Sequence, residues 1–317
     1  MTVTRSEDVE FPDRRGTTLR GRIFHPPSTA SGPRAGVIMA HGFSATKEMA
    51  LFDYAEIIAD GGFSVLVYDH AHLGTSDGEP RQLIDPWIQT DGYGAALDWL
   101  ANQPGIDPQR LGAWGSSFSA GHVLVLGALD DRVRAVVANV PFVGKVHDVE
   151  DANTRFEEMA SRLAAASETT DEVVGPFYPV HGPNIPPDGI VLMEQDEAAE
   201  WFLSEGNRPP AHWRNEVFVR QGTLAPAGPD RKPGQRAASI SGGWNPALAI
   251  SRIRAATLFV ATLDDANCPT VDTLVAFNRA PTPKEMVVLP GHHFVPYRGE
   301  PLIHAATAAR DFYRRWL

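Results

Sequence analysis

Short apolar runs alternate with segments of helical periodicity through most of this sequence. Apolar residues recur at helical spacing from Leu51 to Ile58, and Gly61-Gly62 then ends that helix. Strands that are apolar throughout, separated by helices, are typical of a parallel sheet covered by helices on both faces. The pattern therefore predicts an α/β fold whose core strands are residues 36–40, 63–68, 111–114, 133–140, 257–261 and 286–289.

Three further helices and one hairpin have recognisable signals. Asp85 followed by a proline is typical of a helix N-cap, and another helix is expected to begin at Phe118. The last predicted helix covers about residues 302–316. Near the start of the chain, residues 9–11 and 18–24 flank an Arg-Arg-Gly turn and predict an antiparallel hairpin at the sheet edge. The expected sheet is thus mostly parallel and has about eight strands.

The alternation stops between residues 142 and 239, which are rich in proline and contain one clear helix near residues 154–166. We therefore expect an α/β core formed by residues 1–141 and 240–317, with an inserted helical lid, or cap, at residues 142–239. This segment is called the insertion below. Its aromatic residues either line an apolar substrate pocket or form a small core of the insertion itself; they are Phe177, Tyr178, Trp201, Phe202 and Trp213.

Charge and composition narrow the classes of partner. The chain has 317 residues, a length that fits one catalytic domain with an insertion, and its formal net charge is −11. An acidic surface repels phosphate backbones and anionic lipid, so we expect no nucleic acid and no membrane partner. A small-molecule substrate fits better. The oligomeric state stays open, and a homo-oligomer is compatible with the sequence.

The cellular compartment is expected to be the cytoplasm. Cys268 is the single cysteine, so no intramolecular disulfide can form. The segment from Met1 to Asp8 lacks the apolar stretch of a secretory signal. No later stretch approaches the roughly 20 apolar residues that span a bilayer.

A nucleophile is expected at the turn between an apolar strand and an apolar helix, in the sequence Trp-Gly-Ser-Ser-Phe-Ser-Ala-Gly at residues 114–121. Such a turn requires small residues two positions before and two positions after the nucleophile. Ser116 fails because tryptophan and phenylalanine occupy those positions, whereas Ser117 and Ser119 both pass. Ser117 follows the strand immediately and Ser119 lies within the helix, so we favour Ser117.

A serine hydroxyl needs a base and a carboxylate to become a good nucleophile. In sheets with such a turn, the acid follows a late strand and the histidine follows the last one. Asp264 and Asp265 follow the run 257–261, and His292 and His293 follow the run 286–289. Both loops carry a doubled residue, so two candidates exist for each role. All three loops follow strands, whose carboxyl ends meet at one edge of a parallel sheet.

The oxyanion of the reaction needs backbone N–H donors. We expect one from Phe118, the residue after the nucleophile, and one from Phe43, which follows the first core strand and Gly42. His41 is interpreted as a packing or loop-ordering residue. His70 and His72 beside the histidine pair suggest a metal site only weakly, because no third ligand stands at a suitable spacing. We expect neither a metal nor another cofactor.

These motifs together resemble the α/β-hydrolase superfamily, and within it the dienelactone-hydrolase-like and polyketide-transferase-like enzymes. The resemblance rests on the residues 41–43, the segment 68–78, the serine turn, the spacing from Asp265 to Pro269 and the segment 291–294. It implies Asp265, four residues before that proline, as the acid and His293, in a Gly-x-His-Phe turn, as the base. It also implies a cofactor-free serine enzyme acting on esters, lactones or thioesters. Ser119 departs from the more usual glycine of the turn.

Three functions compete at this point. A hydrolase would transfer the acyl group from Ser117 to water, and an acyltransferase with the same triad would transfer it to an alcohol or amine. A noncatalytic binding protein of this fold would keep the pocket and use the serine only as a hydrogen-bonding group. The complete set of triad candidates favours an enzyme, and we predict a serine hydrolase of small esters, lactones or thioesters.

Overall fold

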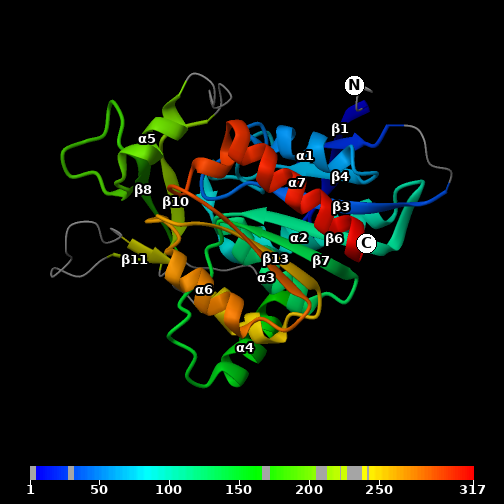
Figure 1. The fold of residues 1–317 in the computed structure, drawn as a ribbon. Coiled ribbons are helices and arrows are strands. Elements are labelled where there is room, and N and C mark those ends of the chain that lie inside the picture. The colour runs from blue at the N-terminus through cyan, green and yellow to red at the C-terminus, as the bar shows by residue number, and fades with distance from the viewer. Residues whose placement is uncertain are drawn as a thin grey trace.

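The computed structural model describes residues 5–27, 32–165, 172–204, 213–221, 223–226, 238–240 and 243–317. Its centre is an eight-stranded sheet in the order β1-β2-β4-β3-β6-β7-β13-β14 (Figure 1). The strands are β1 (Arg5–Pro12), β2 (Thr18–His25), β3 (Arg34–Ala40), β4 (Ser64–Tyr68), β6 (Ile106–Ser116), β7 (Val133–Asn139), β13 (Ala256–Thr262) and β14 (Lys284–Leu289). The predicted α/β fold and its mostly parallel sheet are therefore confirmed.

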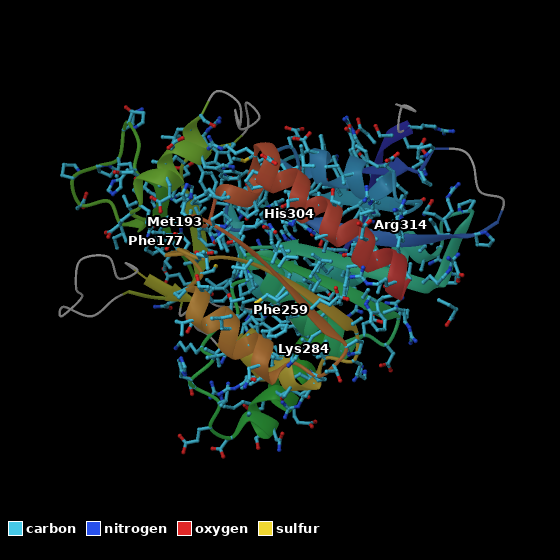
Figure 2. The ribbon with its side chains drawn as sticks, viewed as in Figure 1. Phe177, Met193, Phe259, Lys284, His304 and Arg314 are labelled. Atoms are coloured by element: carbon cyan, nitrogen blue, oxygen red, sulfur yellow. The ribbon has the colours of Figure 1, made fainter. Side chains whose placement is uncertain are left out.

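Helices cover both faces of this sheet because its strands are apolar on both sides. In β3, Val37 and Met39 pack into a core cluster with α1 (Leu51–Ala59) and α7 (Gly299–Trp316), whereas Ile38 packs into another with α2 (Pro86–Ala101) and α3 (Phe118–Leu129). Successive side chains of a strand point to opposite faces, which produces this division. On the second face, Phe259 at the centre of Figure 2 contacts Phe277 of α6 (Thr270–Arg279), with ring centroids 5.7 Å apart.

The sequence signals for individual elements are also confirmed. The hairpin β1–β2 is antiparallel, with Arg5 opposite His25 and Pro12 opposite Thr18. The Asp85 side chain caps α2 by accepting hydrogen bonds from the N–H groups of Trp87 and Ile88 at 2.9 and 3.3 Å. Such a cap satisfies backbone donors that have no partner within the helix.

The insertion contains helices but also a small sheet that the sequence analysis missed. Its helices are α4 (Ala152–Ala164), close to the predicted helix, and α5 (Asp196–Leu203). The small sheet has the order β5-β10-β8-β9, formed by β5 (Leu83–Ile84), β10 (Val217–Arg220), β8 (Val173–Val180) and β9 (Val191–Met193). The description of the insertion as helical was therefore incomplete. The insertion also supplies β11 (Leu224–Pro226) and β12 (Ala238–Ile240), which pair with each other.

One strand of the small sheet belongs to the core. Leu83 and Ile84 of β5 pair in parallel with Phe218 and Val219 of β10. This pairing joins the insertion to the carboxyl-end side of the main sheet, where β8, β10 and α5 lie in Figure 1. Short 3-10 turns complete the described structure: η2 (Pro246–Leu248), η3 (Ile250–Arg252) and η4 (Val295–Tyr297). None of the helices in the described ranges combines the length and the apolar character needed to cross a bilayer.

Candidate active site

Ser117 lies in a strained turn between β6 and α3. Its backbone has φ 54° and ψ −116°, a region that side-chain-bearing residues rarely occupy. The Ser117 N–H donates to the carbonyl of Asn139 at 2.8 Å, which fixes the turn to β7. A Cβ on Gly115 would collide with the carbonyl of Ser119, so the turn requires the glycine that the sequence provides.

A hydrogen-bond chain joins Ser117 to the two loops that follow the last strands. Nε2 of His293 lies 3.0 Å from the Ser117 hydroxyl, and Nδ1 of His293 lies 2.7 Å from Oδ2 of Asp265. The other carboxylate oxygen of Asp265 accepts from the N–H groups of Asn267 and Cys268 at 2.9 and 2.6 Å. His293 and Asp265 are buried. The structure thus brings together the three side chains named from the sequence.

The rival residues make other contacts. Asp264 is exposed, and its N–H donates to the carbonyl of Gly291 at 3.0 Å. Nδ1 of His292 accepts from the N–H of Phe294 at 3.2 Å. Ser119 is buried, with its hydroxyl 2.8 Å from Nε2 of His70 and donating to the His41 carbonyl. The hydrogen-bond chain from Ser117 through His293 to Asp265 therefore includes none of these three side chains.

The two expected oxyanion donors, Phe118 and Phe43, lie in different segments that meet at the serine turn. Phe118 is the first residue of α3, where N–H groups have no partner within the helix. Gly42 packs so close to the nucleophile that a Cβ there would lie 3.0 Å from Cβ of Ser117, and Phe43 follows it. The rings of Phe43 and Phe118 contact each other edge to face at 5.9 Å. Both expected oxyanion donors therefore belong to segments in contact at the serine turn.

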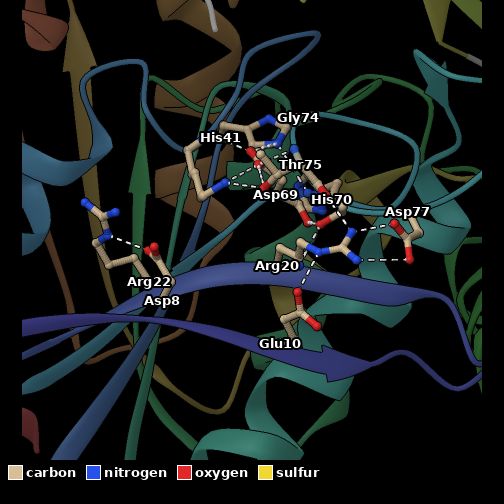
Figure 3. A network of polar contacts seen from close by, with 12 residues as sticks. Asp8, Glu10, Arg20, Arg22, His41, Asp69, His70, Gly74, Thr75 and Asp77 are labelled. Carbon is tan, nitrogen blue, oxygen red and sulfur yellow. Dashed lines mark hydrogen bonds and ion pairs between the residues drawn. The ribbon is translucent and has the colours of Figure 1, made fainter. Parts of the chain in front are cut away.

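His41 belongs to a buried network that orders the loop after β4, as interpreted from the sequence. Asp69 accepts hydrogen bonds from the N–H of Lys47 at 2.7 Å, the Lys47 ammonium at 2.5 Å and the N–H of Thr75 at 2.9 Å. Figure 3 shows Asp69 and Thr75 beside His41, whose Nε2 accepts from the His70 N–H at 3.3 Å. Burial opposes ionisation of Asp69, but the charges of Lys47 and His41 and the hydrogen bonds from Lys47 together hold the pKa of Asp69 below its ordinary value.

Two further buried histidines lie behind the serine turn. Burial, followed by the proximity of His41, lowers the pKa of His122 to about 3 and that of His70 well below its ordinary value. The His122 ring contacts the Phe118 ring at 4.8 Å. Both histidines are therefore neutral packing residues near pH 7. In the described ranges, no group of three or more His, Cys, Asp or Glu side chains is placed to hold a metal ion.

A small, mostly apolar cavity lies next to Ser117 and His293, with about 20 Å³ of space that the centre of a water-sized sphere can reach. Trp201 and Phe202 of α5 and Met193 of β9 form the side of the cavity that the insertion contributes. Trp213 supports them: it stacks on Phe202 at 5.8 Å, and its Nε1 donates to the Ser44 carbonyl at 2.7 Å. Trp201, Phe202 and Trp213 thus both surround the cavity and belong to a small separate core cluster that the insertion shares with the α/β core, whereas Phe177 packs against the main core.

Several site residues escaped the sequence analysis. Tyr297 and Met193 line the cavity, and the Cys268 sulfur lies 3.9 Å from the Ser117 hydroxyl. Cys268 lies in the acid loop three residues after Asp265, which is the one signal that could have indicated it. Tyr297 follows His293 by four residues, but that spacing alone predicts no contact.

The sheet order, the serine at a strand-to-helix turn and the histidine after the last strand define the protein as an α/β-hydrolase enzyme. A family model described as X-Pro dipeptidyl-peptidase (S15 family) matches residues 15–295. The chain belongs to the S15 family.

Relatives of this chain carry several different names. The thiohydrolase aneE of Aspergillus aculeatus is 40% identical over 43% of this chain and 42% of its own length. This chain thus spans less than half of that relative. The quorum-quenching protein AidA of Acinetobacter baumannii is 29% identical over 97% of this chain and 94% of its own.

A third relative matches both in sequence and in structure. The polyketide transferase grgF of Penicillium sp is 29% identical over 92% of this chain and 89% of its own. The crystal structure of the α/β-hydrolase GrgF from Penicillium sp. sh18 matches with a TM-score of 0.70 and 25% identity, over 98% of this chain and 99% of that one. The fold and class are therefore shared well beyond the serine turn.

Proposed function

We propose that the protein cleaves a small carboxylic ester, lactone or thioester through an acyl-enzyme on Ser117. His293 is the general base, Asp265 orients it, and the N–H groups of Phe43 and Phe118 stabilise the oxyanion. The observation that carries this proposal is the continuous hydrogen-bond chain of 3.0 and 2.7 Å from Ser117 through His293 to Asp265. That is the arrangement a nucleophile, base and orienting acid require.

The reaction proceeds in two halves. The Ser117 oxygen attacks the carbonyl carbon while its proton passes to Nε2 of His293, and the negative charge develops on the former carbonyl oxygen. The bond to the leaving alcohol or thiol then breaks, and that group takes the proton from His293. Water subsequently gives its proton to His293 and attacks the acyl-enzyme, which releases the acid and restores the Ser117 hydroxyl. Asp265 orients His293 and stabilises its imidazolium form through the hydrogen bond to Nδ1.

The lining of the cavity supports a neutral acyl group over a peptide with a free amino terminus. Besides His293, none of its lining residues in the described ranges carries an ionisable acid or base other than the Tyr297 phenol. A dipeptidyl-peptidase must recognise a terminal ammonium, which is costly to desolvate without an acidic partner. The relatives named for thioester hydrolysis and polyketide transfer agree with the neutral class.

The test is turnover of p-nitrophenyl esters, a thioester and an X-Pro p-nitroanilide by the intact protein, with Ser117→Ala as the control. We expect turnover of esters and the thioester, little of the anilide, and none by the variant. Ester turnover that persists in Ser117→Ala would reject Ser117 as the nucleophile. Turnover confined to the anilide would reject the neutral acyl class.

Acyl transfer is a second candidate, favoured by the polyketide transferase that matches over most of the chain. The same acyl-enzyme would pass its acyl group to an alcohol or amine. Adding an alcohol acceptor to the ester assay and quantifying both products separates the two functions. Transfer that outruns hydrolysis at modest acceptor concentration would replace the hydrolase assignment. A protein that turns over nothing and resists serine labelling would be a binding protein.

Three features of organisation complete the proposal. We propose that residues 142–239 act as a lid, supported by the contribution of Trp201 and Phe202 to the cavity. We propose a homo-oligomer formed at the edge strand β14, because Val288 of β14 and Val271 and Leu274 of α6 are exposed apolar side chains. Light scattering of the protein and of Val271→Asp tests this, with a monomer expected only for the variant.

We also propose a cytoplasmic location. Its support is the cysteine content: Cys268 is the single cysteine of the sequence, so no intramolecular disulfide can form and the chain does not depend on an oxidising compartment. Fractionation of source cells followed by immunodetection tests it, and protein found only outside the cytoplasm would reject it.

A further inference from the structure

The cavity beside Ser117 is closed by side chains from the insertion. Met193 of β9, labelled in Figure 2, and Trp201 and Phe202 of α5 line it together with Met49 and Phe294 of the core. All five are apolar or aromatic; four are buried members of one separate core cluster, and the partly buried Met193 packs against it. The part of the cavity away from Ser117 therefore favours binding of a hydrocarbon chain over binding of a charged group.

The side chains that the insertion contributes to the cavity form its wall, and this wall packs directly onto the loop of His293. The Trp201 ring stacks on Phe294 at 5.3 Å and contacts Tyr297 at 5.0 Å, with Phe294 next to His293 in the sequence. Phe202 meets Trp201 edge to face at 4.7 Å. Because these aromatic contacts bury the Trp201 side chain to 3% exposure, the wall cannot yield to a longer substrate without losing them.

We propose that this cavity is the acyl-binding pocket, and that Met193, Trp201 and Phe202 restrict the acyl group to a short, neutral, apolar chain. The inference rests on the proposed function and adds to it the class of acyl group. The space inside the cavity that the centre of a water-sized sphere can reach is about 20 Å³, little more than the about 10–15 Å³ that one water molecule needs, which favours a short acyl chain. The proposal places the leaving group outside this pocket, so the size limit concerns the acyl side of the substrate only.

The experiment measures kcat/KM for p-nitrophenyl acetate, butyrate, hexanoate and octanoate. Met193 is partly exposed, so Met193→Ala enlarges the pocket without removing a fully buried residue, and Met193→Trp fills it. Leu192→Ala is the matched control, because Leu192 precedes Met193 in β9 but packs against the main core cluster on the other side. Phe202→Ala provides a second enlargement.

We expect kcat/KM of the natural protein to fall by about tenfold or more from butyrate to octanoate, since lost or forced methylene contacts have effects of that order. Met193→Ala and Phe202→Ala should move the optimum to longer chains, Met193→Trp should move it to acetate, and Leu192→Ala should leave it unchanged. An unchanged profile in all Met193 variants, with Ser117 still labelled by a phosphonate, overturns the pocket assignment alone. Absent labelling and turnover in the natural protein would instead overturn the proposed function.

A separate observation concerns the residue before the nucleophile. The Ser116 hydroxyl lies 2.5 Å from the Tyr297 hydroxyl and accepts from Nδ2 of Asn139 at 3.0 Å. Tyr297 lies at the end of the turn that follows His293, and the preceding residue of that turn accepts a hydrogen bond from the Tyr54 hydroxyl at 2.8 Å. The serine turn and the histidine loop are therefore joined by a buried hydrogen bond in addition to the contact of Ser117 with His293.

We infer that Tyr297 is a positioning residue that holds the His293 loop at its distance from Ser117. Ser116 directly precedes the nucleophile, and Tyr297 follows the base by four residues. A displacement of either hydroxyl would therefore change the distance between Ser117 and His293. Small misplacements of catalytic groups reduce rates by orders of magnitude. The Tyr297 ring also lines the acyl pocket, but the hydroxyl points to the serine turn and not to substrate.

The test compares Tyr297→Phe with Tyr313→Phe. Both changes remove one buried hydroxyl, and that of Tyr313 donates to the Ala113 carbonyl at 2.8 Å away from the site. We expect the rate of phosphonate labelling of Ser117 to fall about tenfold or more in Tyr297→Phe only, with KM for the butyrate ester unchanged and with similar losses of thermal stability in both variants. Adding Ser116→Ala should reduce the rate little further. Equal labelling rates in the two tyrosine variants would overturn the inference.

Discussion

Oδ2 of Asp265 lies 2.7 Å from Nδ1 of His293, although 28 residues separate the two in the chain. A carboxylate at this position fixes the tautomer in which Nε2 of His293 is free to accept the Ser117 proton. We therefore expect Asp265→Asn to lower kcat by about 10⁴-fold, with little change of KM. Steady-state kinetics measures both, and the exposed Asp264→Asn serves as control. A large loss in the control with full activity of Asp265→Asn would give the role to Asp264.

The catalytic side chains are expected to act as a unit. Ser117→Ala and His293→Ala should each remove nearly all turnover, because neither group has a function in the reaction without the other. The double variant should then be little slower than either single variant. Rates of the three variants, measured on one ester, decide this. Additive losses would show that the two side chains act independently.

Lys47 is expected to stabilise the fold through Asp69. The Lys47 side chain is 7% exposed and that of Asp69 1%, so Lys47→Met would leave a buried carboxylate without its counter-ion. We expect a loss of about 3–5 kcal/mol in the free energy of unfolding. The exposed pair of Arg22 with Asp8, also seen in Figure 3, is the control, and Arg22→Ala should cost at most about 1 kcal/mol. Urea denaturation measures both, and equal losses would contradict the prediction.

His122 should make the fold sensitive to acid. Its pKa is about 3 in the folded protein and 6.5 as its ordinary value, so between those pH values the unfolded chain binds a proton that the folded chain does not. Stability therefore falls as the pH decreases from about 6.5, by up to about 1.4 kcal/mol per pH unit for one such group. The variant His122→Asn should lose less stability per pH unit than the natural protein, whatever the stability of the variant at pH 7. Urea midpoints from pH 7 to pH 4 test it, and an unchanged slope would assign the acid sensitivity to other groups.

The core and the identity of the central residues could be predicted because local patterns determine them. Asp85 followed by a proline predicts the start of its helix. Small flanking residues exclude Ser116 from the turn, and the position directly after the strand favours Ser117 over Ser119. The catalytic members of the doubled residues in the acid and base loops were harder to identify. Asp264 and Asp265, for example, differ in exposure only once the loop is folded. Family spacing, and not the chemistry of the residues, separated them.

The small sheet and the tyrosine contact lay beyond local patterns. Strand β8 contains Pro176 and Pro179, which obscure strand periodicity, and its sheet depends on a partner strand of only two residues, Leu83–Ile84. The contact of Ser116 with Tyr297 joins residues 181 positions apart, and no spacing rule relates them. Long-range packing of this kind determines the shape of the pocket. The class of acyl group could therefore be inferred only from the structure.

The most direct test of the central proposal is the site of covalent labelling by a p-nitrophenyl alkylphosphonate. The natural protein is inactivated, digested and mapped by mass spectrometry, with His293→Ala treated in parallel. We expect one adduct, on Ser117, forming orders of magnitude more slowly in the variant because His293 no longer removes the proton. An adduct on Ser116 or Ser119, or one that forms equally fast in the variant, would contradict the assignment of Ser117 as the nucleophile activated by His293.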